Sequence, residues 1–310
     1  MASSGWTAAD IPDQRGRIAV VTGANSGVGF ETARMLAERG ARVVLACRDT
    51  GKAAAACDAI RATAPDADLR TVRLDLADAA SVRTAAAVLD EEFDHIDLVI
   101  NNAGAAFGKL SLVDGVDRTF VTNQLGPFAF TGLLLHRVTA APAGRIVTVT
   151  SGGHEMGRLL LDDLGFAKSR YRRWRAYTQT KLANVLFATE LQRRLAAAGT
   201  PAISVAAHPG AAATEFGRNS GGVLRVASAP PVRWLLAPLV NTAAEGALPT
   251  LRAAVDPQVR GGDLYGPAGP HGIKGRPERV EAAAVARDEG AGAMVWERCE
   301  QLTGVRYPLP

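Results

Sequence analysis

The chain of 310 residues lacks several features by which a sequence often reveals its class. It has only three cysteines, Cys47, Cys57 and Cys299, with no C-x-x-C spacing, which argues against a disulfide framework or a zinc site and favours a reducing compartment. No apolar run reaches the length of a membrane span, and the first residues have neither a basic nor an apolar leader region. The net charge of +4 is too small an excess to indicate nucleic-acid binding. We therefore expect a soluble, cytoplasmic protein with no zinc site, no nucleic-acid partner and no membrane span.

A regular alternation of short β-branched segments with longer alanine-rich segments runs from Arg17 through most of the chain. This alternation predicts an α/β fold: one Rossmann-type, doubly wound parallel sheet of about seven strands, with helices on both faces. Residues 1–16 are expected to form an irregular N-terminal arm, residues 17–310 a single domain, and residues 208–260 an inserted loop-and-helix region. The strands are predicted at 17–22, 41–46, 69–74, 96–101, 145–150, 201–207 and 261–265, and the helices at 27–39, 51–63, 79–93, 115–139 and 174–198.

A glycine-rich segment, TGANSGVG (22–29), follows the first predicted strand and opens the first predicted helix. Free amide groups and the positive end of the helix dipole favour an anion at such a turn. Gly23 permits a tight turn, Gly27 lets the backbone approach a phosphate, and Gly29 lets the helix pack close to the sheet. The residues expected around a dinucleotide pyrophosphate are Gly23, Asn25, Ser26, Gly27, Val28 and Gly29.

The end of the second predicted strand reads Cys47-Arg48-Asp49, where this type of fold recognises the adenosine ribose. Arg48 can form a forked pair of hydrogen bonds with a phosphate, whereas Cys47 is poorly suited to hold two ribose hydroxyls. The sequence therefore favours NADP(H) over NAD(H). Asp49 leaves room for NAD, and Arg48 could instead be a solvated loop charge.

Tyr177 and Lys181 lie four residues apart in the last predicted long helix, so both side chains are expected on one face. A phenol with a pKa near 10 becomes a useful acid-base catalyst at neutral pH only when a nearby positive charge stabilises its anion. Ser151 follows the fifth strand, at the sheet edge where open α/β folds place their sites, and its hydroxyl could hold a substrate oxygen.

These motifs together resemble the short-chain dehydrogenase/reductase family over about residues 17 to 307. The Gly-rich loop is similar to the family's cofactor loop, and residues 101–104 are similar to its NNAG segment. The family's catalytic tetrad is matched by Asn123, Ser151, Tyr177 and Lys181. The resemblance implies that the cofactor is also held by Arg48, Asp75, Leu76, Asn102, Ala103, Gly104, Tyr177, Lys181, Pro209, Gly210 and Thr214.

The resemblance also implies the role of each tetrad residue. Tyr177 acts as general acid in reduction and general base in oxidation, while Ser151 orients the carbonyl or alcohol oxygen. Lys181 lowers the pKa of Tyr177 and holds the nicotinamide ribose, and Asn123 anchors a water that links Lys181 to solvent. Hydride passes directly between nicotinamide and substrate carbon, so no metal is required.

Within the family, the segments LACRD (45–49), LDDLGF (161–166), KLANVLF (181–187), HPG (208–210) and LTGVRY (302–307) are similar to the retinol-dehydrogenase-like branch, which includes NADP-linked reductases of lipophilic carbonyls. The chain reads TVTS where members of that branch commonly read NVSS, and it lacks the membrane-anchoring segment of animal retinoid enzymes. We therefore expect a soluble bacterial member with a lipophilic substrate of its own.

Three variable segments bear on the substrate. The predicted lid, residues 211–240, is rich in apolar side chains, which suit either an apolar substrate or ordinary helix packing. The basic run 169–175 fits a solvated face better than a nucleic-acid site, with an anionic substrate group as the other interpretation. His154 either touches substrate or makes a local hydrogen bond within its loop.

Two other functions stay open, and so does the oligomeric state. A sugar-nucleotide epimerase or dehydratase would share Tyr177 and Lys181, and a non-catalytic NADP sensor would keep only the cofactor loop and Arg48. From the resemblance, a homodimer or homotetramer would form through the helices at about 115–139 and 174–198.

Overall fold

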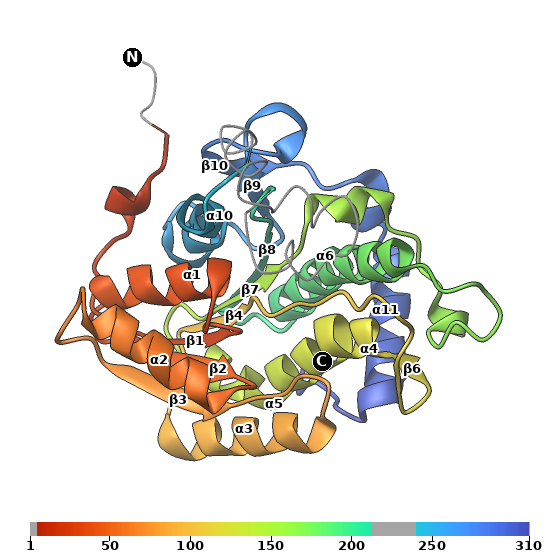
Figure 1. Cartoon of the computed structure of the whole chain (residues 1–310), viewed down its shortest axis with the longest axis horizontal. Helices are drawn as coiled ribbons and strands as arrows, with labels where there is room; N and C mark the ends of the chain where they lie inside the picture. Colours follow the sequence, from red (N-terminus) through yellow and green to blue (C-terminus); the bar gives the residue numbers. More distant parts are fainter. Residues whose placement is uncertain (1–4, 212–239, 310) are drawn as a thin grey trace.

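The computed structural model describes residues 5–211 and 240–309, and its centre is a sheet of eight strands (Figure 1). Their order in the sheet is β10-β9-β8-β7-β4-β1-β2-β3. The chain runs from β1 through β2 to β3 at one edge, then crosses back to β4 beside β1 and continues toward the other edge. The β-branched segments found in the sequence form the buried middle of this sheet because a parallel sheet covered on both faces needs apolar side chains throughout. The strands are β1 (Ile18–Thr22), β2 (Arg42–Cys47), β3 (Leu69–Arg73), β4 (Leu98–Asn101), β7 (Arg145–Val149), β8 (Ile203–Ala207), β9 (Leu264–Pro267) and β10 (Pro277–Val280).

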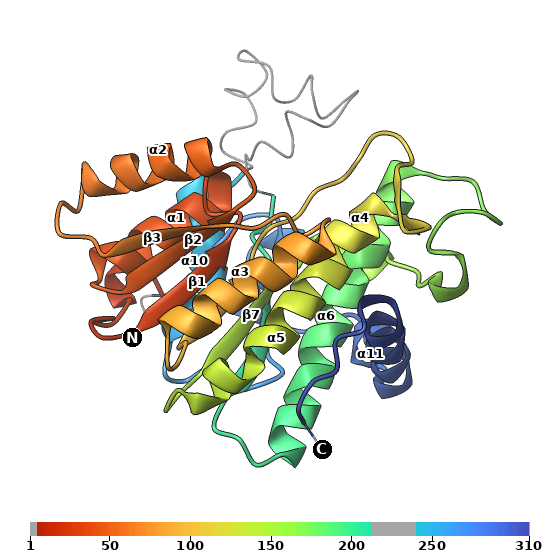
Figure 2. The ribbon, with the colours of Figure 1, turned by 90° about the horizontal axis from the view of Figure 1, so that it is seen from below.

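Helices cover both faces of the sheet, as the alternation predicts (Figure 2). One face packs against α1 (Gly27–Glu38), α2 (Thr50–Arg61) and α10 (Ala243–Val255). The other packs against α3 (Ala79–Glu92), α5 (Gly126–Ala140) and α6 (Arg173–Ala197). Gly40 and Gly199 follow α1 and α6 with φ of 90° and 65°, a backbone conformation that glycine adopts readily at helix ends.

The predicted fold class is confirmed, and the sheet has one strand more than the predicted number of about seven. The edge strand β10 pairs antiparallel with β9. Its sequence, PERV, starts with proline and turns Glu278 and Arg279 to solvent, so it has no apolar run that could reveal a strand. Proline and charge are typical of an edge strand because neither fits the middle of a sheet.

The helix predicted at about 115–139 begins three residues later than expected, at Arg118. Asp114 and Gly115 have φ of 49° and 79° and join the two short strands β5 (Leu112–Val113) and β6 (Val116–Asp117) in a hairpin. An Asp-Gly pair favours this kind of two-residue turn. The chain then passes through α4 (Arg118–Phe120) and one π-helical turn, Val121–Leu125, before α5 begins.

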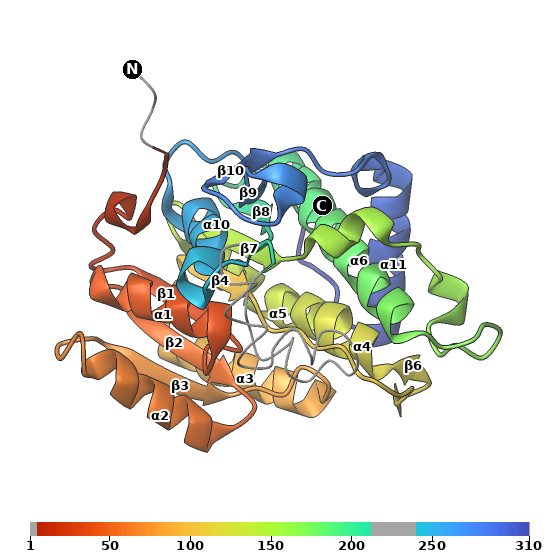
Figure 3. The same cartoon turned by 45° about the horizontal axis from the view of Figure 1, so that its top comes forward.

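A C-terminal helix, α11 (Glu289–Thr303), packs on the outer sides of α5 and α6 (Figure 3). Trp296, 1% exposed, packs against Phe128 of α5 and Phe187 of α6 with ring centroids 5.2 and 6.0 Å away. Tyr307 then crosses α5 and donates a 2.7 Å hydrogen bond to the Phe128 carbonyl. Within the described residues, no helix is both long and apolar enough to cross a membrane.

Candidate active site

The predicted site residues meet where parallel strands end at one edge of the sheet. The Gly-rich turn follows β1, the NNAG segment begins at the last residue of β4, and Ser151 comes two residues after β7. The strand order reverses between β1 and β4, and open α/β sheets bind their ligands at such a switch point.

The Gly-rich turn has the backbone geometry that a pyrophosphate site needs. Gly23 and Gly27 have φ of 66° and 57°, and a Cβ on Gly29 would collide with the Asn102 amide and the Gly23 carbonyl. Ser26 is the N-cap residue of α1, yet among the described residues its side chain makes no capping hydrogen bond. The first amides of α1 are therefore placed for an anion, so these residues fit a dinucleotide cofactor.

The NNAG segment is tied to the end of β1 by a set of short hydrogen bonds. The Thr22 hydroxyl accepts from the backbone N–H groups of Asn102 at 3.0 Å and Ala103 at 2.9 Å. The Asn102 amide donates to the Thr22 carbonyl at 2.8 Å. Asn102 therefore fixes the distance between two loops that would line a bound cofactor, while Gly104 faces the Lys181 ammonium, 3.4 Å from where a Cβ would lie.

Tyr177 lies in the first turns of α6 and is 8% exposed. Burial raises the pKa of Tyr177, and its hydrogen bond with Ser151 acts in the opposite direction. The Ser151 hydroxyl oxygen also accepts from the Gly153 amide at 3.2 Å. The two hydroxyl groups that would face a carbonyl are thus already hydrogen-bonded to each other, although 26 residues separate Ser151 from Tyr177 along the sequence.

Lys181 lies beneath Tyr177, with its Nζ 5.7 Å from the centre of the tyrosine ring. Its ammonium donates to the Val149 carbonyl at 2.9 Å and to Asn184 Oδ1 at 3.2 Å. Burial lowers the pKa of Lys181 to about 8, because a buried charge loses its hydration. This ammonium is close enough to stabilise a tyrosinate at Tyr177.

Asn123 lies in the π-helical turn and joins the NNAG loop to α6. Its side chain exchanges two 2.8 Å hydrogen bonds with the backbone of Ala105 and donates to the Thr180 hydroxyl at 3.1 Å. The structure therefore brings all four predicted tetrad residues into one cluster, with the Asn123 side chain fixing the loop that begins at β4.

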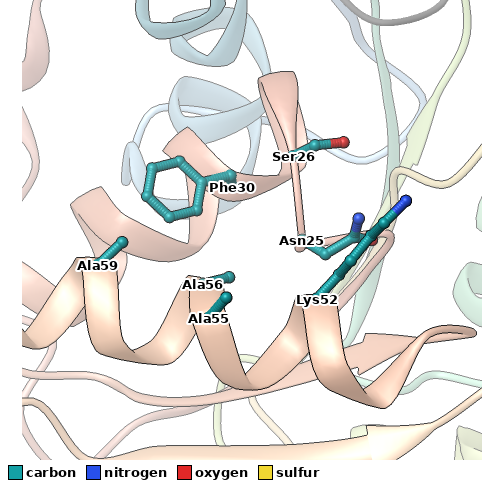
Figure 4. A pocket seen from close by; sticks show the side chains of 7 residues that line it. All are labelled: Asn25, Ser26, Phe30, Lys52, Ala55, Ala56 and Ala59. Atoms are coloured by element: carbon teal, nitrogen blue, oxygen red, sulfur yellow. The ribbon is translucent and has the colours of Figure 1, made fainter.

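At the predicted adenosine end, Arg48 is exposed directly after β2, while Asp49 caps α2 by accepting from the Lys52 amide at 3.0 Å. Asp75 accepts from the Ala77 amide at 3.0 Å, and Leu76 is buried with its carbonyl against α5. A cavity of about 340 Å³ opens between α1 and α2 (Figure 4). It is lined by Asn25, Ser26, Phe30, Lys52, Ala55, Ala56 and Ala59.

Lys52 was not predicted, although its side chain reaches from α2 toward Asn25 of the Gly-rich turn (Figure 4). The sequence signal that could have indicated Lys52 is its position four residues after Arg48, in the first turn of the next helix.

Trp174 and Asn184 were missed as well: Trp174 packs on Tyr177 with ring centroids 5.6 Å apart, and Asn184 contacts Lys181. Both lie one turn from a predicted residue on the same helix.

The predicted nicotinamide segment is described only in part. The Pro209 carbonyl accepts a 2.9 Å hydrogen bond from the Asn241 side chain, and Gly210 has φ of 68° at a place where a Cβ would collide with the Ile273 carbonyl. Thr214 lies outside the described residues, as does the predicted lid apart from its two end residues.

The other variable residues have local partners. His154 is 1% exposed and its Nδ1 lies 2.8 Å from the Ser151 carbonyl, which confirms the local hydrogen bond. In the basic run, Arg170 and Arg172 are exposed, whereas Tyr171 turns inward and donates to the Phe107 carbonyl at 2.6 Å. Arg170 and Arg172 thus face solvent, while Arg173 and Arg175 are half-buried at the start of α6.

Comparison with known proteins agrees with this geometry. The model of the short chain dehydrogenase family matches residues 17–222. The chain belongs to the short-chain dehydrogenase/reductase family. Human retinol dehydrogenase 13 is 36% identical over 297 residues, which cover 94% of this chain and 86% of that protein. Human retinol dehydrogenase 12 is 40% identical over 77% of this chain and 73% of its own length.

Solved structures of other proteins show the same fold. An uncharacterized protein from Mycobacterium paratuberculosis is 40% identical, with a TM-score of 0.81 over 99% of this chain and 100% of the other. The RhlG/NADP active-site complex of Pseudomonas aeruginosa is 22% identical, with a TM-score of 0.65 over 81% of this chain and 94% of that one. This short-chain dehydrogenase/reductase is thus an oxidoreductase of the retinol-dehydrogenase-like branch, acting on alcohol or carbonyl groups.

Proposed function

We propose that this chain is an NADP(H)-dependent reductase or dehydrogenase that interconverts a lipophilic carbonyl compound and its alcohol. The observation that carries the proposal is the cluster of Ser151, Tyr177 and Lys181 at the carboxyl edge of the sheet, with the ammonium 5.7 Å from the phenol ring. A buried phenol beside a buried ammonium is suited to moving a proton to or from an oxygen atom.

In reduction, the Ser151 and Tyr177 hydroxyls donate hydrogen bonds to the substrate carbonyl oxygen, and Tyr177 transfers its proton to that oxygen as charge develops there. Lys181 stabilises the resulting tyrosinate through its positive charge. A bound nicotinamide supplies the hydride. In oxidation, the same tyrosinate accepts the alcohol proton, so activity in that direction rises with pH through the Tyr177 pKa.

The preference for NADP(H) rests on two cations and one occupied carboxylate. Arg48 is exposed directly after β2, and Lys52 lines the cavity beside the Gly-rich turn, so both can meet the phosphate on the adenosine ribose. Asp49, the carboxylate that would favour NAD, accepts the Lys52 amide as the cap of α2. The RhlG and Burkholderia cenocepacia structures of similar fold are NADP complexes.

The proposed lipophilic substrate rests on the side chains around the tyrosine. Trp174 is 50% exposed, stacks on Tyr177 and lies over Gly153, two residues after Ser151. Met156, at the end of the same 3-10 turn as Gly153, is 60% exposed. Exposed apolar side chains beside a reacting group favour an apolar ligand, and the similar human proteins are named retinol dehydrogenases.

The test is NADPH oxidation by the purified protein over aldehydes and ketones graded in size and polarity, with NADH run in parallel. We expect turnover with NADPH, and kcat/KM that rises with the apolar area of the substrate. Trp174→Ala should lower kcat/KM about 10-fold for the large apolar substrates and leave the smallest one almost unchanged, because a stacked aromatic contact is worth about 0.5–1.5 kcal/mol beyond its area. Cofactor binding without any turnover would instead favour a sensor.

A further inference from the structure

Asn241, a buried residue close before α10, joins segments that lie far apart in the sequence. Its Nδ2 group donates to the Pro209 carbonyl at 2.9 Å and to the Ile273 carbonyl at 3.3 Å. Its backbone N–H donates to the Ala211 carbonyl at 2.8 Å, and the Ala211 N–H donates to the Ile273 carbonyl at 2.9 Å. Asn241 therefore ties the turn after β8 to the start of α10 and to the segment between β9 and β10.

The orientation of the Asn241 amide follows from these partners. Backbone carbonyls can only accept hydrogen bonds, so the NH₂ group must face Pro209 and Ile273. The amide oxygen is buried and has no hydrogen-bond partner within the described residues. An unpartnered acceptor is unfavourable in a protein interior, so the two N–H donors are what this side chain contributes to the fold.

Gly210 leaves the room that this amide needs. Its φ is 68°, and a Cβ at this position would collide with the Ile273 carbonyl and with Asn241 Nδ2. Any other residue would therefore displace the Asn241 side chain as well as strain the backbone. The glycine and the asparagine together determine the course of the turn after β8.

The start of α10 gives the Asn241 side chain a fixed base. The Thr242 hydroxyl accepts from the Glu245 N–H at 3.1 Å, and the Glu245 carboxylate accepts from the Thr242 N–H at 2.7 Å. Lys274 donates to the Val240 carbonyl at 3.3 Å, and its Nζ lies 3.8 Å from the Glu245 carboxylate. The helix itself packs on α1 and β9 (Figure 3). The amide therefore projects from a part of the domain that is held on several sides.

The turn after β8 leaves the sheet beside Ser151. β7 and β8 run parallel with Val149 opposite Ala207, so Ser151 and Pro209, each two residues farther on, follow neighbouring strands at the same edge. Direct hydride transfer requires the nicotinamide to contact the carbon whose oxygen Ser151 holds. The turn after β8 is therefore a surface against which that ring fits.

We propose that Asn241 is a positioning residue for the nicotinamide half of the cofactor: its two N–H donors hold Pro209 and Gly210 in the conformation against which the ring binds. The proposal rests on the proposed function in taking the cofactor to be NADP(H). Asn241 acts through the turn and not by touching the cofactor. The adenosine half, which is placed at the Gly-rich turn and Arg48, does not depend on this contact.

The test compares two ligands that differ in the nicotinamide group alone. NADPH carries the ring, whereas 2′-phospho-ADP-ribose has the same adenosine phosphate, pyrophosphate and second ribose without it. Asn241→Asp keeps the shape of the side chain and replaces the two N–H donors with an acceptor. Isothermal titration gives the Kd of both ligands, and thermal unfolding of the free protein gives the Tm. The added charge acts on the phosphates of both ligands, so it cancels in the ratio of the two Kd values.

We expect Asn241→Asp to raise the Kd for NADPH about 10-fold, the effect of losing hydrogen bonds that hold the binding surface. The Kd for 2′-phospho-ADP-ribose should rise by much less, so the ratio changes by most of that factor. The kcat for a carbonyl substrate should also fall about 10-fold because the ring is no longer held in one place.

Gln14→Glu is the matched control. Gln14 is also buried, and its side-chain amide donates to the Pro12 carbonyl at 3.0 Å and to the Asp13 carbonyl at 3.2 Å. It precedes β1 and thus lies at the opposite edge of the sheet. The control should lower the Tm and leave both Kd values unchanged.

An unchanged ratio in Asn241→Asp would overturn the proposal, and an equal rise in both Kd values with a lower Tm would indicate a purely structural role. If Asn241→Asp does not fold, Asn241→Ala serves instead: it removes the same donors without adding a charge and must change the ratio in the same direction. A changed ratio in a protein that turns over no carbonyl would refute the proposed function and leave the role of Asn241 standing.

Discussion

At the scale of single residues, two cations, one at the end of β2 and one lining the cavity between α1 and α2, should decide which dinucleotide this enzyme prefers. Arg48 is exposed at the end of β2, and Lys52 lines the hollow between α1 and α2 (Figure 4). Each charged hydrogen bond to a phosphate is worth about 1.5–3 kcal/mol, or roughly 10–100-fold in affinity. Arg48→Ala and Lys52→Ala should each raise the Kd for NADPH by about that factor and leave the Kd for NADH nearly unchanged.

Isothermal titration of both cofactors measures this selectivity directly. Arg61→Ala is the control, because Arg61 is an exposed cation at the C-terminal end of α2, the helix that carries Lys52 near its start. An equal loss of NADH and NADPH affinity in the Arg48 variant would show that Arg48 holds a part common to both cofactors.

At the scale of elements, α11 is bound to the domain by an aromatic cluster rather than by surface charge. The ring centroid of Trp296 lies 4.4 Å from that of Tyr307 and 5.2 Å from that of Phe128. The guanidinium carbon of Arg194 lies 4.4 Å from the centroid of the indole. Removing a fully buried indole costs about 3–5 kcal/mol because a cavity is left behind. Trp296→Ala should therefore lower the free energy of unfolding by that amount in a denaturant titration.

Trp174 gives the matched comparison for this substitution. Its indole is 50% exposed, so Trp174→Ala should cost less than half as much stability while affecting the substrate. Equal losses in the two variants would contradict the view that α11 is part of the core.

At the scale of the whole molecule, α11 covers the helices through which the family resemblance suggested a dimer or tetramer. Val295, Trp296 and Cys299 are buried against α5 and α6, while the outward residues Glu297 and Gln301 are exposed. A second copy would meet this outer side of α11, where the exposed Met294 and Leu302 stand among charged and polar side chains, instead of a continuous apolar face. We therefore expect multi-angle light scattering to give the mass of one chain at micromolar concentration; a stable dimer would show that subunits pair through another surface.

Much of this molecule could be predicted from sequence because its main signals are local. The β-branched segments gave six of the strands closely, and the spacing of Tyr177 and Lys181 put both on one side of α6. The failures have physical causes: β10 has no apolar run, and the Asp114-Gly115 turn interrupts a segment that otherwise has helical composition.

Contacts between distant segments account for the rest. Lys52 approaches the Gly-rich turn only because α1 and α2 lie side by side, and Asn184 meets the Asn123 carbonyl across 61 residues of sequence. Neither approach leaves a pattern within one helix. The packing on α5 of the segment that follows α11 likewise depends on Gly132, where any Cβ would collide with the Val305 and Tyr307 side chains.

The central claim is that Tyr177 transfers the proton in an NADPH-dependent carbonyl reduction, and one variant tests it most directly. Tyr177→Phe removes a single oxygen from a side chain that is 8% exposed and leaves its ring and its contact with Trp174 in place. We predict that the variant binds NADPH with nearly unchanged affinity and loses at least 100-fold in kcat for the best carbonyl substrate, in line with the contribution of a positioned general acid. Full turnover in Tyr177→Phe would contradict the account.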